Sequence, residues 1–560
     1  MSKSRILVID DDELVSKTVK NLLTRQGYEV STAHNAIEAV SLVAVQVFDL
    51  VISDIRMPGD NGIIAIEKIQ KIYSEKKIHC GYLLITGYTE EDTPAHAIRL
   101  GINKFLFKPF DNEKILKDIQ EELELVQKEK ALKEGTASAQ PKTKTSKRDR
   151  EYSRRAVITG IGCVAPNGIG KEAYWNGLLA GTNCVDEITF FDASTFPARY
   201  AAEIRNFDPR AFIEEYSEVK RMGRSSHLAV AGAKLSLQDA GLTKEDLPPD
   251  TPVIFGSAIS GLEYVETDFR ALERGGVKRV RPFLGIAGFA GAISSEISRA
   301  LGIRGHSVTI STGCTSSTDA IGYALGAIRE GKSDLIISGG ADACVASGIL
   351  AAFCQMGAVS FRNDKKASRP FNQDRGGFVI SEGSWVFVVE ELQHALARKA
   401  TIYGEIVGYG STCDAWHMAK PHPSGEYTAQ AIRMALDDGN VAPEQIDLFE
   451  TYGNGTPVND SYETGVIKKV FGKHAYSLLA PSIKSMIGHP LGAAGSQQVA
   501  AALGAFKLGR VHPTINYEIP DPECDLNYVP NVAVEKNVKA AVCSSIAFGA
   551  KNSALVLKKI

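Results

Sequence analysis

The sequence contains no apolar run that approaches the roughly 18–20 residues of a membrane-spanning helix. The longest candidate, Ile349 to Val359, is too short and includes Gln355. The nine cysteines form no Cys-x-x-Cys pair, which excludes a disulfide framework. A net charge of −3 gives no excess of positive charge for nucleic-acid binding. Together with a strand-like start at Arg5–Ile9 in place of a signal peptide, these absences predict a cytoplasmic protein with reduced thiols, no membrane insertion and no nucleic-acid partner.

The composition is that of a globular protein, and the 560 residues are too many for a single core. Residues 1–125 alternate five short apolar strands with amphipathic helices. This alternation predicts an α/β domain with a parallel sheet and helices on both of its faces. The expected strands are Arg5–Ile9, Glu29–Ala33, Leu50–Ser53, Tyr82–Thr86 and Lys104–Phe107.

The last helix of this domain shows apolar residues at helical spacing, namely Leu116, Ile119, Leu123 and Val126. For its first half, this pattern favours packing in the domain core over a coiled coil.

Residues 126–155 separate this domain from a larger region. A small, polar and then basic segment follows, either a solvated tether or a docking segment for an acidic partner. Residues 156–405 and 406–560 again alternate strands and helices and are predicted to be two related halves of one domain.

Acidic and polar residues stand at the carboxyl ends of the N-terminal strands. Asp10 and Asp11 follow the first strand and Asp54 follows the third, while Thr86 ends the fourth and Lys108 follows the fifth. These ends meet at one edge of a parallel sheet, where ligands bind. Helix capping explains a single acid there. A cluster of three would repel itself without a divalent cation, and oxygen ligands suit Mg²⁺.

On these residues, positions 3–125 resemble the receiver domain of two-component response regulators, which has a flavodoxin-like fold. The resemblance implies phosphorylation by a histidine kinase or a phosphotransfer protein. It implies Asp54 as the phosphoacceptor, Asp10, Asp11 and Asp54 around Mg²⁺, Thr86 and Lys108 as contacts of the phosphoryl group, and Phe105 as the aromatic switch.

A glycine-flanked cysteine, Cys314, is the most informative residue of the larger region. It lies in the turn 311–317, between a short strand at 307–310 and a helical pattern from Asp319 to Ile328. The start of a helix stabilises a thiolate, so this turn predicts a nucleophile that accepts acyl groups. The alternative is a small buried cysteine that only packs.

Several landmarks in sequence order accompany this cysteine, and with them the region from Val157 to Ile560 resembles the β-ketoacyl-acyl carrier protein synthases of type II fatty-acid synthesis. The landmarks are Ser368–Phe371, Asp414–Met418, Lys484–His489 and Phe548-Gly549. The resemblance implies a thiolase-like αβαβα fold and a homodimer. It implies Cys314 as the acyl acceptor, His489 as a histidine of the condensation step, Lys484 and Glu463 as its supporting pair, and the N–H groups of Cys314 and Phe548 as an oxyanion hole.

The sequence departs from this family at one reactive position. Where the family carries Ala-His-Gly-Thr-x-Thr-Pro, the chain reads Thr451-Tyr452-Gly453-Asn454-Gly455-Thr456-Pro457. Tyr452 therefore replaces an imidazole, and a phenol with a pKa of about 10 is a poor base near neutral pH. Asn454 and Ala419 also replace threonines that are expected to touch phosphopantetheine.

The substrate is expected to arrive on the phosphopantetheine arm of an acyl carrier protein, with no resident cofactor. By the resemblance, His417, Asn454 and Thr456 contact this arm. Lys220, Arg221, Lys278 and Arg279 lie where the family places carrier-binding charges, although each pair alone would more often be an ordinary solvated surface.

The predicted function is therefore a ketosynthase-type acyltransferase that acts on carrier-bound thioesters in fatty-acid, lipid or polyketide synthesis, under control of receiver phosphorylation. Three alternatives remain: an acyltransferase that does not elongate, an acyl-sensing protein without turnover, and a partner subunit of another ketosynthase. No helix-turn-helix pattern follows residues 1–125, which disfavours a transcription factor.

Overall fold

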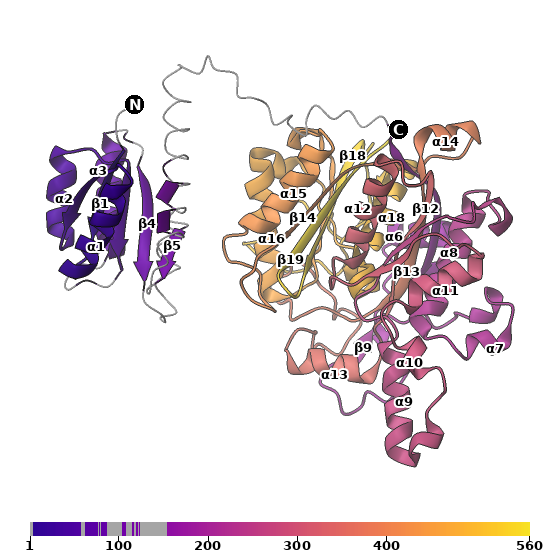
Figure 1. Cartoon of the computed structure of the whole chain (residues 1–560). Coiled ribbons are helices and arrows are strands. Elements are labelled where there is room, and N and C mark those ends of the chain that lie inside the picture. Colours follow the sequence, from indigo (N-terminus) through magenta and orange to yellow (C-terminus); the bar gives the residue numbers. More distant parts are fainter. Residues whose placement is uncertain are drawn as a thin grey trace. The chain divides into compact units, whose positions relative to one another are not determined.

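The computed structural model describes residues 4–55, 57, 62–76, 78, 80–86, 104–107, 115–116, 119–120, 123 and 154–560. The chain divides into two compact units, Met1–Lys144 and Thr145–Ile560 (Figure 1). Most of the predicted linker, 126–155, lies outside the described residues. Arg154 and Arg155 are described and belong to the second unit. Arg155 donates to Glu405 at 2.7 and 2.6 Å, and Arg154 donates to the carbonyl of Ile328 at 2.9 Å.

The first unit contains the predicted parallel sheet. Its strands are β1 (Arg5–Ile9), β2 (Glu29–Ala33), β3 (Leu50–Asp54), β4 (Gly81–Thr86) and β5 (Lys104–Phe107). They lie in the order β2-β1-β3-β4-β5 with every neighbouring pair parallel. The five predicted strands are confirmed to within a residue.

Two apolar clusters cover the two faces of this sheet. On one face, Leu7 and Ile9 pack with residues of α2 (Ala36–Val45) and α3 (Gly62–Glu75). On the other, Ile6 and Val8 pack with α1 (Glu13–Arg25) and with Ile119 and Leu123. The helical stripe at 116–123 therefore supplies core residues, as its spacing predicts.

The second unit is built on one long mixed sheet whose two halves repeat the same pattern. Along the sheet the first half runs β11 (Ser307–Ile310), β10 (Val253–Gly256), β12 (Leu335–Ala343), β13 (Glu382–Glu391) and β6 (Ala156–Ala165). The second half runs β14 (Gly404–Cys413), β19 (Lys551–Lys558), β18 (Ala540–Ala547) and β15 (Leu448–Glu450). In each half the outer strands pair in parallel and the inner strands antiparallel.

Helices form three further layers around the sheet halves (Figure 1). The central layer is α12 (Ser316–Arg329) packed against α18 (Ala494–Leu508), and both contribute to the largest apolar core. One outer layer is α8 (Arg224–Asp239) with α11 (Ala292–Leu301). The other is α15 (Glu426–Asp438) with α16 (Pro457–Phe471). This αβαβα arrangement confirms the predicted fold class.

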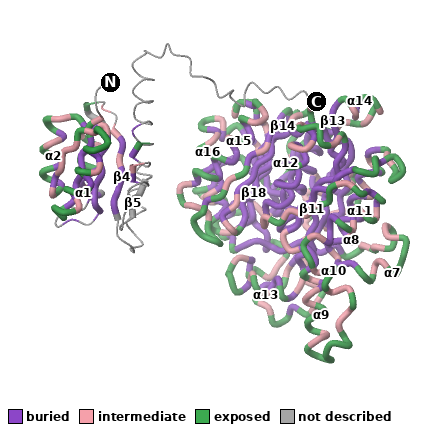
Figure 2. Tube along the Cα trace, viewed as in Figure 1, coloured by how far each residue is buried: buried purple, intermediate pink, exposed green. Residues whose placement is uncertain are grey.

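The remaining elements of the second unit complete these layers, and most of them are short. The helices are α6 (Lys171–Leu179), α7 (Tyr216–Val219), α9 (Leu262–Gly275), α10 (Leu284–Ala287), α13 (Ser347–Gln355), α14 (Leu392–Ala397) and α17 (Lys484–Ile487). The strands are β7 (Gly168–Ile169), β8 (Asp186–Glu187), β9 (Tyr200–Ala201), β16 (Arg510–Val511) and β17 (Val534–Glu535). Figure 2 shows buried chain at the centre of the second unit, where β6, β12, β13 and β18 are buried along their whole length. Within the described ranges, no helix has both the length and the apolarity to cross a bilayer.

Candidate functional site

Cys314 lies in the turn between β11 and α12, at the centre of the second unit. The preceding Gly313 has a φ of +73°, which favours glycine, and a Cβ there would lie 3.2 Å from the Cβ of Ala547. Cys314 itself is only 4% exposed. The turn thus presents the thiol to the interior of the fold, against the chain that leaves β18.

Burial dominates the acidity of this thiol. It raises the pKa of Cys314 to about 11, and the Tyr452 hydroxyl, which hydrogen-bonds the sulfur, and the Lys484 ammonium only partly oppose it. From sequence alone, the helix start predicts a stabilised thiolate. Burial acts against that prediction, because loss of water disfavours the charged form of the thiol.

Tyr452 and His489 meet beside this thiol. Tyr452 follows β15, and its hydroxyl lies 3.0 Å from Nε2 of His489. Burial, followed by the neighbouring Cys314, raises the pKa of the Tyr452 phenol well above its ordinary value. The phenol is therefore held neutral, with one hydroxyl shared between an imidazole and a thiol.

His489 is fixed by its backbone and by an aromatic neighbour. Its backbone N–H donates to the carbonyl of Val379 at 2.8 Å. Its ring meets the ring of Phe378 edge-on, with 5.2 Å between the ring centres. Burial, and then the charge of Lys484, holds the pKa of His489 well below its ordinary value, so the ring is a neutral imidazole. Its Nδ1 is buried and makes no hydrogen bond to any part of the chain that the structure describes.

Lys484 and Glu463 stand behind Tyr452. The Lys484 Nζ lies 4.9 Å from the centre of the Tyr452 ring, a cation–π contact. The Glu463 carboxylate accepts the N–H groups of Tyr452 at 2.7 Å and Gly453 at 2.8 Å. Burial raises the pKa of Glu463 and lowers that of Lys484. The pair therefore positions the tyrosine through its backbone and its ring.

Gln498 is a positioning residue that the sequence analysis missed. It lies buried in α18, and its Nε2 lies within hydrogen-bond distance of the carbonyls of Thr451 at 2.7 Å and Ser544 at 2.9 Å. It thus connects the residue that follows β15, next to Tyr452, with the middle of β18. The sequence does offer a clue, because Gln498 is a polar residue in a helix of mostly small and apolar residues, Ala494–Leu508. An amide buried in such a helix is expected to hydrogen-bond to the backbone.

A cavity of about 350 Å³ opens toward these residues from the surface. Tyr452, which contacts His489, and Ala547, which faces Gly313 beside Cys314, both line it, so the cavity reaches the neighbours of the thiol. Asn454 and Thr456 also line it, as expected of residues that contact a substrate arm. The full lining is Met356, Gly357, Ala358, Ala419, Lys420, Pro421, Tyr452, Asn454, Thr456, Pro457, Val458, Asn459, Ile546, Ala547 and Phe548.

Two other predicted residues lie around this cavity. Phe548 follows β18, is 39% exposed and stacks on Phe353 at 6.4 Å. His417 does not line the cavity itself. Its Nδ1 accepts the N–H groups of Ala419 at 2.9 Å and Lys420 at 3.2 Å, so it shapes the loop that does.

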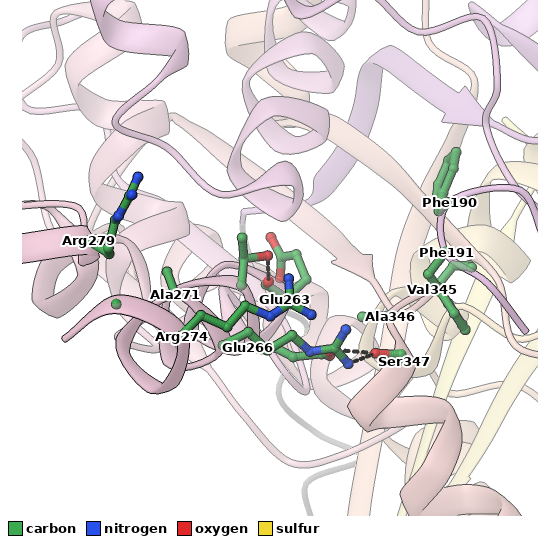
Figure 3. Close-up of a pocket in the computed structure, with 13 residues that line it drawn as sticks. Phe190, Phe191, Glu263, Glu266, Ala271, Arg274, Arg279, Val345, Ala346 and Ser347 are labelled. Carbon is green, nitrogen blue, oxygen red and sulfur yellow. Dashed lines mark hydrogen bonds and ion pairs between the residues drawn. The ribbon is translucent and has the colours of Figure 1, made fainter.

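A larger cavity of about 720 Å³ lies elsewhere, beside α9 (Figure 3). Arg274 and Arg279 line it on one side, Phe190 and Phe191 lie on the other, and Arg270 is also part of the lining. It contains none of the residues around Cys314, so volume alone does not identify the reactive site. Of the four predicted carrier-binding residues, Arg279 lines this larger cavity and none lines the smaller one.

In the first unit, the structure brings Asp10, Asp11 and Asp54 together. One oxygen of each lies within 4.8 Å of the others, with Asp10 and Asp54 buried and Asp11 exposed. Asp12 caps α1 by accepting the N–H groups of Leu14 and Val15, and its own N–H donates to Asp10 at 2.9 Å. Such an oxygen cluster fits Mg²⁺. Thr86 ends β4 and Phe105 lies within β5, whereas Lys108 lies outside the described residues.

Comparisons with known protein families match both units. The sequence model of the response regulator receiver domain matches residues 6–120. The models of the beta-ketoacyl synthase N-terminal and C-terminal domains match residues 153–395 and 403–518.

Curated relatives and solved structures agree with these matches. A 3-oxoacyl-[acyl-carrier-protein] synthase 2 of Synechocystis sp. is 40% identical over 409 residues, which cover 72% of this chain and 98% of the relative. The tetracenomycin polyketide synthase ketoacyl synthase alpha subunit of Streptomyces glaucescens is 38% identical, over 73% of this chain and 98% of the relative. The ishigamide ketosynthase/chain length factor structure superposes with a TM-score of 0.69 at 36% identity, over 73% of this chain and 99% of that one.

Proposed function

The chain belongs to the β-ketoacyl synthase family and carries a response regulator receiver domain at its N-terminus, and from this we propose that it is a receiver-controlled ketosynthase acting on thioesters of an acyl carrier protein. The observation that carries the proposal is the meeting of Cys314, Tyr452, His489 and Lys484, from three separate segments, beside a cavity that Tyr452 lines. A solved relative, a type II polyketide ketosynthase, is seen in complex with its acyl-carrier protein, which supports the same kind of partner here.

In the first step, the sulfur of Cys314 attacks the carbonyl carbon of the incoming thioester. The carbon–sulfur bond to the carrier breaks, and the carrier thiol leaves with the proton. The N–H groups of Cys314 and Phe548 are proposed to stabilise the oxyanion. The buried thiol makes proton removal the demanding part of this step.

In the second step, a malonyl thioester loses CO₂, and the resulting enolate attacks the acyl group on Cys314 and releases the thiolate. The donors proposed for the enolate oxygen are the neutral imidazole of His489 and the hydroxyl of Tyr452. A neutral ring donates from only one nitrogen, and here Nε2 is the nitrogen that faces Tyr452. Tyr452 is thus proposed to stand in place of the family's other histidine, and to limit the condensation step.

A second candidate, acyl transfer without elongation, is favoured by the same tyrosine. Intact-protein mass spectrometry separates the two. Incubation with an acyl carrier protein thioester is expected to add one acyl mass at Cys314, and C314A is expected to show none. Subsequent addition of malonyl carrier protein is expected to release CO₂ and remove that mass. Loss of the acyl mass to the carrier without CO₂ would establish transfer alone, and an unmodified Cys314 would refute both.

Phosphorylation of Asp54 is proposed to control this activity. Beryllofluoride with Mg²⁺ imitates the phosphoryl group at the three carboxylates and adds acceptor atoms that reorder a receiver face. We expect it to change the rate of Cys314 acylation at least about threefold in the full chain, which corresponds to at least about 0.7 kcal/mol of coupling. Asp54→Asn is the matched control and should abolish the response. An equal rate with and without the mimic would show that the two units are not coupled.

The chain is proposed to act as a homodimer. β11 is the edge strand of the long sheet, and its residues are exposed or half-buried in the single chain. Near it Ile286 and Phe289 are 57% and 52% exposed. An unpaired edge with adjacent exposed apolar residues suits a second copy of the same surface.

A further inference from the structure

A buried acid–base pair lies close to Tyr452 in the chain and takes no part in either proposed step. Glu450, the last residue of β15, stands two residues before the tyrosine. Its carboxylate lies 3.0 Å from Nε2 of His512, which follows β16, and both side chains are buried. Nδ1 of the same ring lies 3.1 Å from the carbonyl of Pro513. Both ring nitrogens therefore face oxygen acceptors, which suits an imidazolium, the form that donates from both.

The imidazolium compensates a charge that would otherwise be isolated in the core. Burial opposes the charge of His512, but the neighbouring Glu450 carboxylate outweighs it and raises the pKa of His512 above its ordinary value. Burial lowers the pKa of Lys484 to about 8, and Glu450 is one of the anions that oppose this effect. Removing one partner of a buried ion pair leaves the other charge uncompensated. Loss of His512 alone would thus leave a bare carboxylate beside the segment that carries Tyr452.

The chain that follows His512 also reaches the other side of the tyrosine. Residues 451–456 form neither helix nor strand, so side-chain contacts determine where Tyr452 lies. The carbonyl of Gly453, directly after the tyrosine, accepts the hydroxyl of Ser482 at 2.6 Å. The N–H of Ser482 donates in turn to the hydroxyl of Thr514 at 2.9 Å. One short stretch, 512–514, therefore holds the chain on both sides of the tyrosine.

We propose that His512 and Thr514 are positioning residues for Tyr452, and that together they keep its hydroxyl within reach of His489 and Cys314. Both act through the chain that carries the tyrosine and not on the substrate. The hydroxyl is the far end of a rigid side chain and lies 3.0 Å from Nε2 of His489. A misplacement of only about 1 Å can cost a reaction about a hundredfold. The inference rests on the proposed function and identifies what supports the phenol in place of the family's histidine.

The first test measures alkylation of Cys314 by iodoacetamide at neutral pH. The Tyr452 hydroxyl hydrogen-bonds this sulfur whether or not the protein turns over a substrate. His512→Gln is expected to slow alkylation about three- to tenfold, the effect of losing that hydrogen bond. Adding Glu450→Gln removes the uncompensated charge and places two amides opposite each other. The double variant E450Q/H512Q is therefore expected to return to within about twofold of the wild type.

Further variants separate positioning from general stability. Thr514→Val keeps the shape of the side chain and removes the hydroxyl that accepts the Ser482 N–H, and it should slow alkylation about threefold. His394→Gln is the matched control, because His394 pairs with a glutamate on β13, and it should leave the rate unchanged. Cys163 and Cys543 are buried and report folding, since they react only when the chain opens.

The second test introduces His512→Gln into a chain that already carries Tyr452→Phe. With no hydroxyl left to position, the added change is expected to alter Cys314 alkylation by less than about twofold. In the tyrosine background, single-turnover CO₂ release from malonyl carrier protein should fall about tenfold, while acylation of Cys314 stays within about threefold.

Each outcome supports or overturns the proposal. An equal loss with tyrosine and with phenylalanine at position 452 overturns it, and so does an unchanged alkylation rate in folded His512→Gln. If His512→Gln does not fold, Thr514→Val decides by the same two criteria. A wild type that no carrier thioester acylates at Cys314 refutes the proposed function, and the alkylation rates still decide the role of His512 separately.

Discussion

Alkylation of Cys314 by iodoacetamide is expected to accelerate about tenfold for each pH unit between about pH 6 and pH 8, with no plateau near neutrality. Only the thiolate reacts, and below a pKa of about 11 its fraction rises tenfold per unit. The gain should become smaller at higher pH, because Lys484 loses its proton and no longer stabilises the thiolate. Over the accessible range the rate should therefore rise by at least about a hundredfold.

Peptide mass spectrometry measures this rate at Cys314 separately from the other cysteines, among which Cys413 is exposed. Tyr452→Phe is the matched variant, because it keeps the ring and removes the hydroxyl that hydrogen-bonds the thiol. At a fixed neutral pH it should slow alkylation about three- to tenfold. A rate that levels off at about pH 7 would mean that the start of α12 stabilises the thiolate more than burial opposes it.

The sequence was sufficient for the parts of the fold that depend on local pattern. The five short apolar strands of the first unit could be located because polar residues or turns bound each of them. The approach of Asp10, Asp11 and Asp54 followed because carboxyl ends of parallel strands share one edge. The position of Cys314 between a strand and a helix could be predicted from the sequence in the same way.

The properties that depend on distant segments were not predictable in this way. The pKa of Cys314 is set by what covers it, and Tyr452 and Ala547 come from far along the chain. No local pattern states that the Tyr452 hydroxyl lies 3.0 Å from His489. Similarly, the ring of His417, which is predicted to contact the substrate arm, accepts two backbone N–H groups of its own loop through Nδ1, a role that only the folded loop defines.

Replacing Tyr452 by histidine is expected to accelerate decarboxylation of malonyl carrier protein about 10²- to 10³-fold, the usual worth of one well-placed donor at a developing oxyanion. The phenol is hard to ionise in this buried site and occupies Nε2 of His489. An imidazole is shorter, so it leaves Nε2 free to face the substrate carbonyl and adds a ring N–H of its own. Release of labelled CO₂ measures the step directly.

Acylation of Cys314 provides the internal control for this variant, because the first step needs the thiol and the oxyanion hole and not a second imidazole. Tyr452→His should therefore acylate within about threefold of the wild type while its decarboxylation rises. Tyr452→Phe, which has no donor at all, should decarboxylate no faster than the wild type. A fall in CO₂ release with histidine would contradict this interpretation. It would mean that the Tyr452 hydroxyl, which contacts His489 and Cys314, is itself the hydrogen-bond donor to the enolate oxygen. Condensation in this protein would then depend on the phenol.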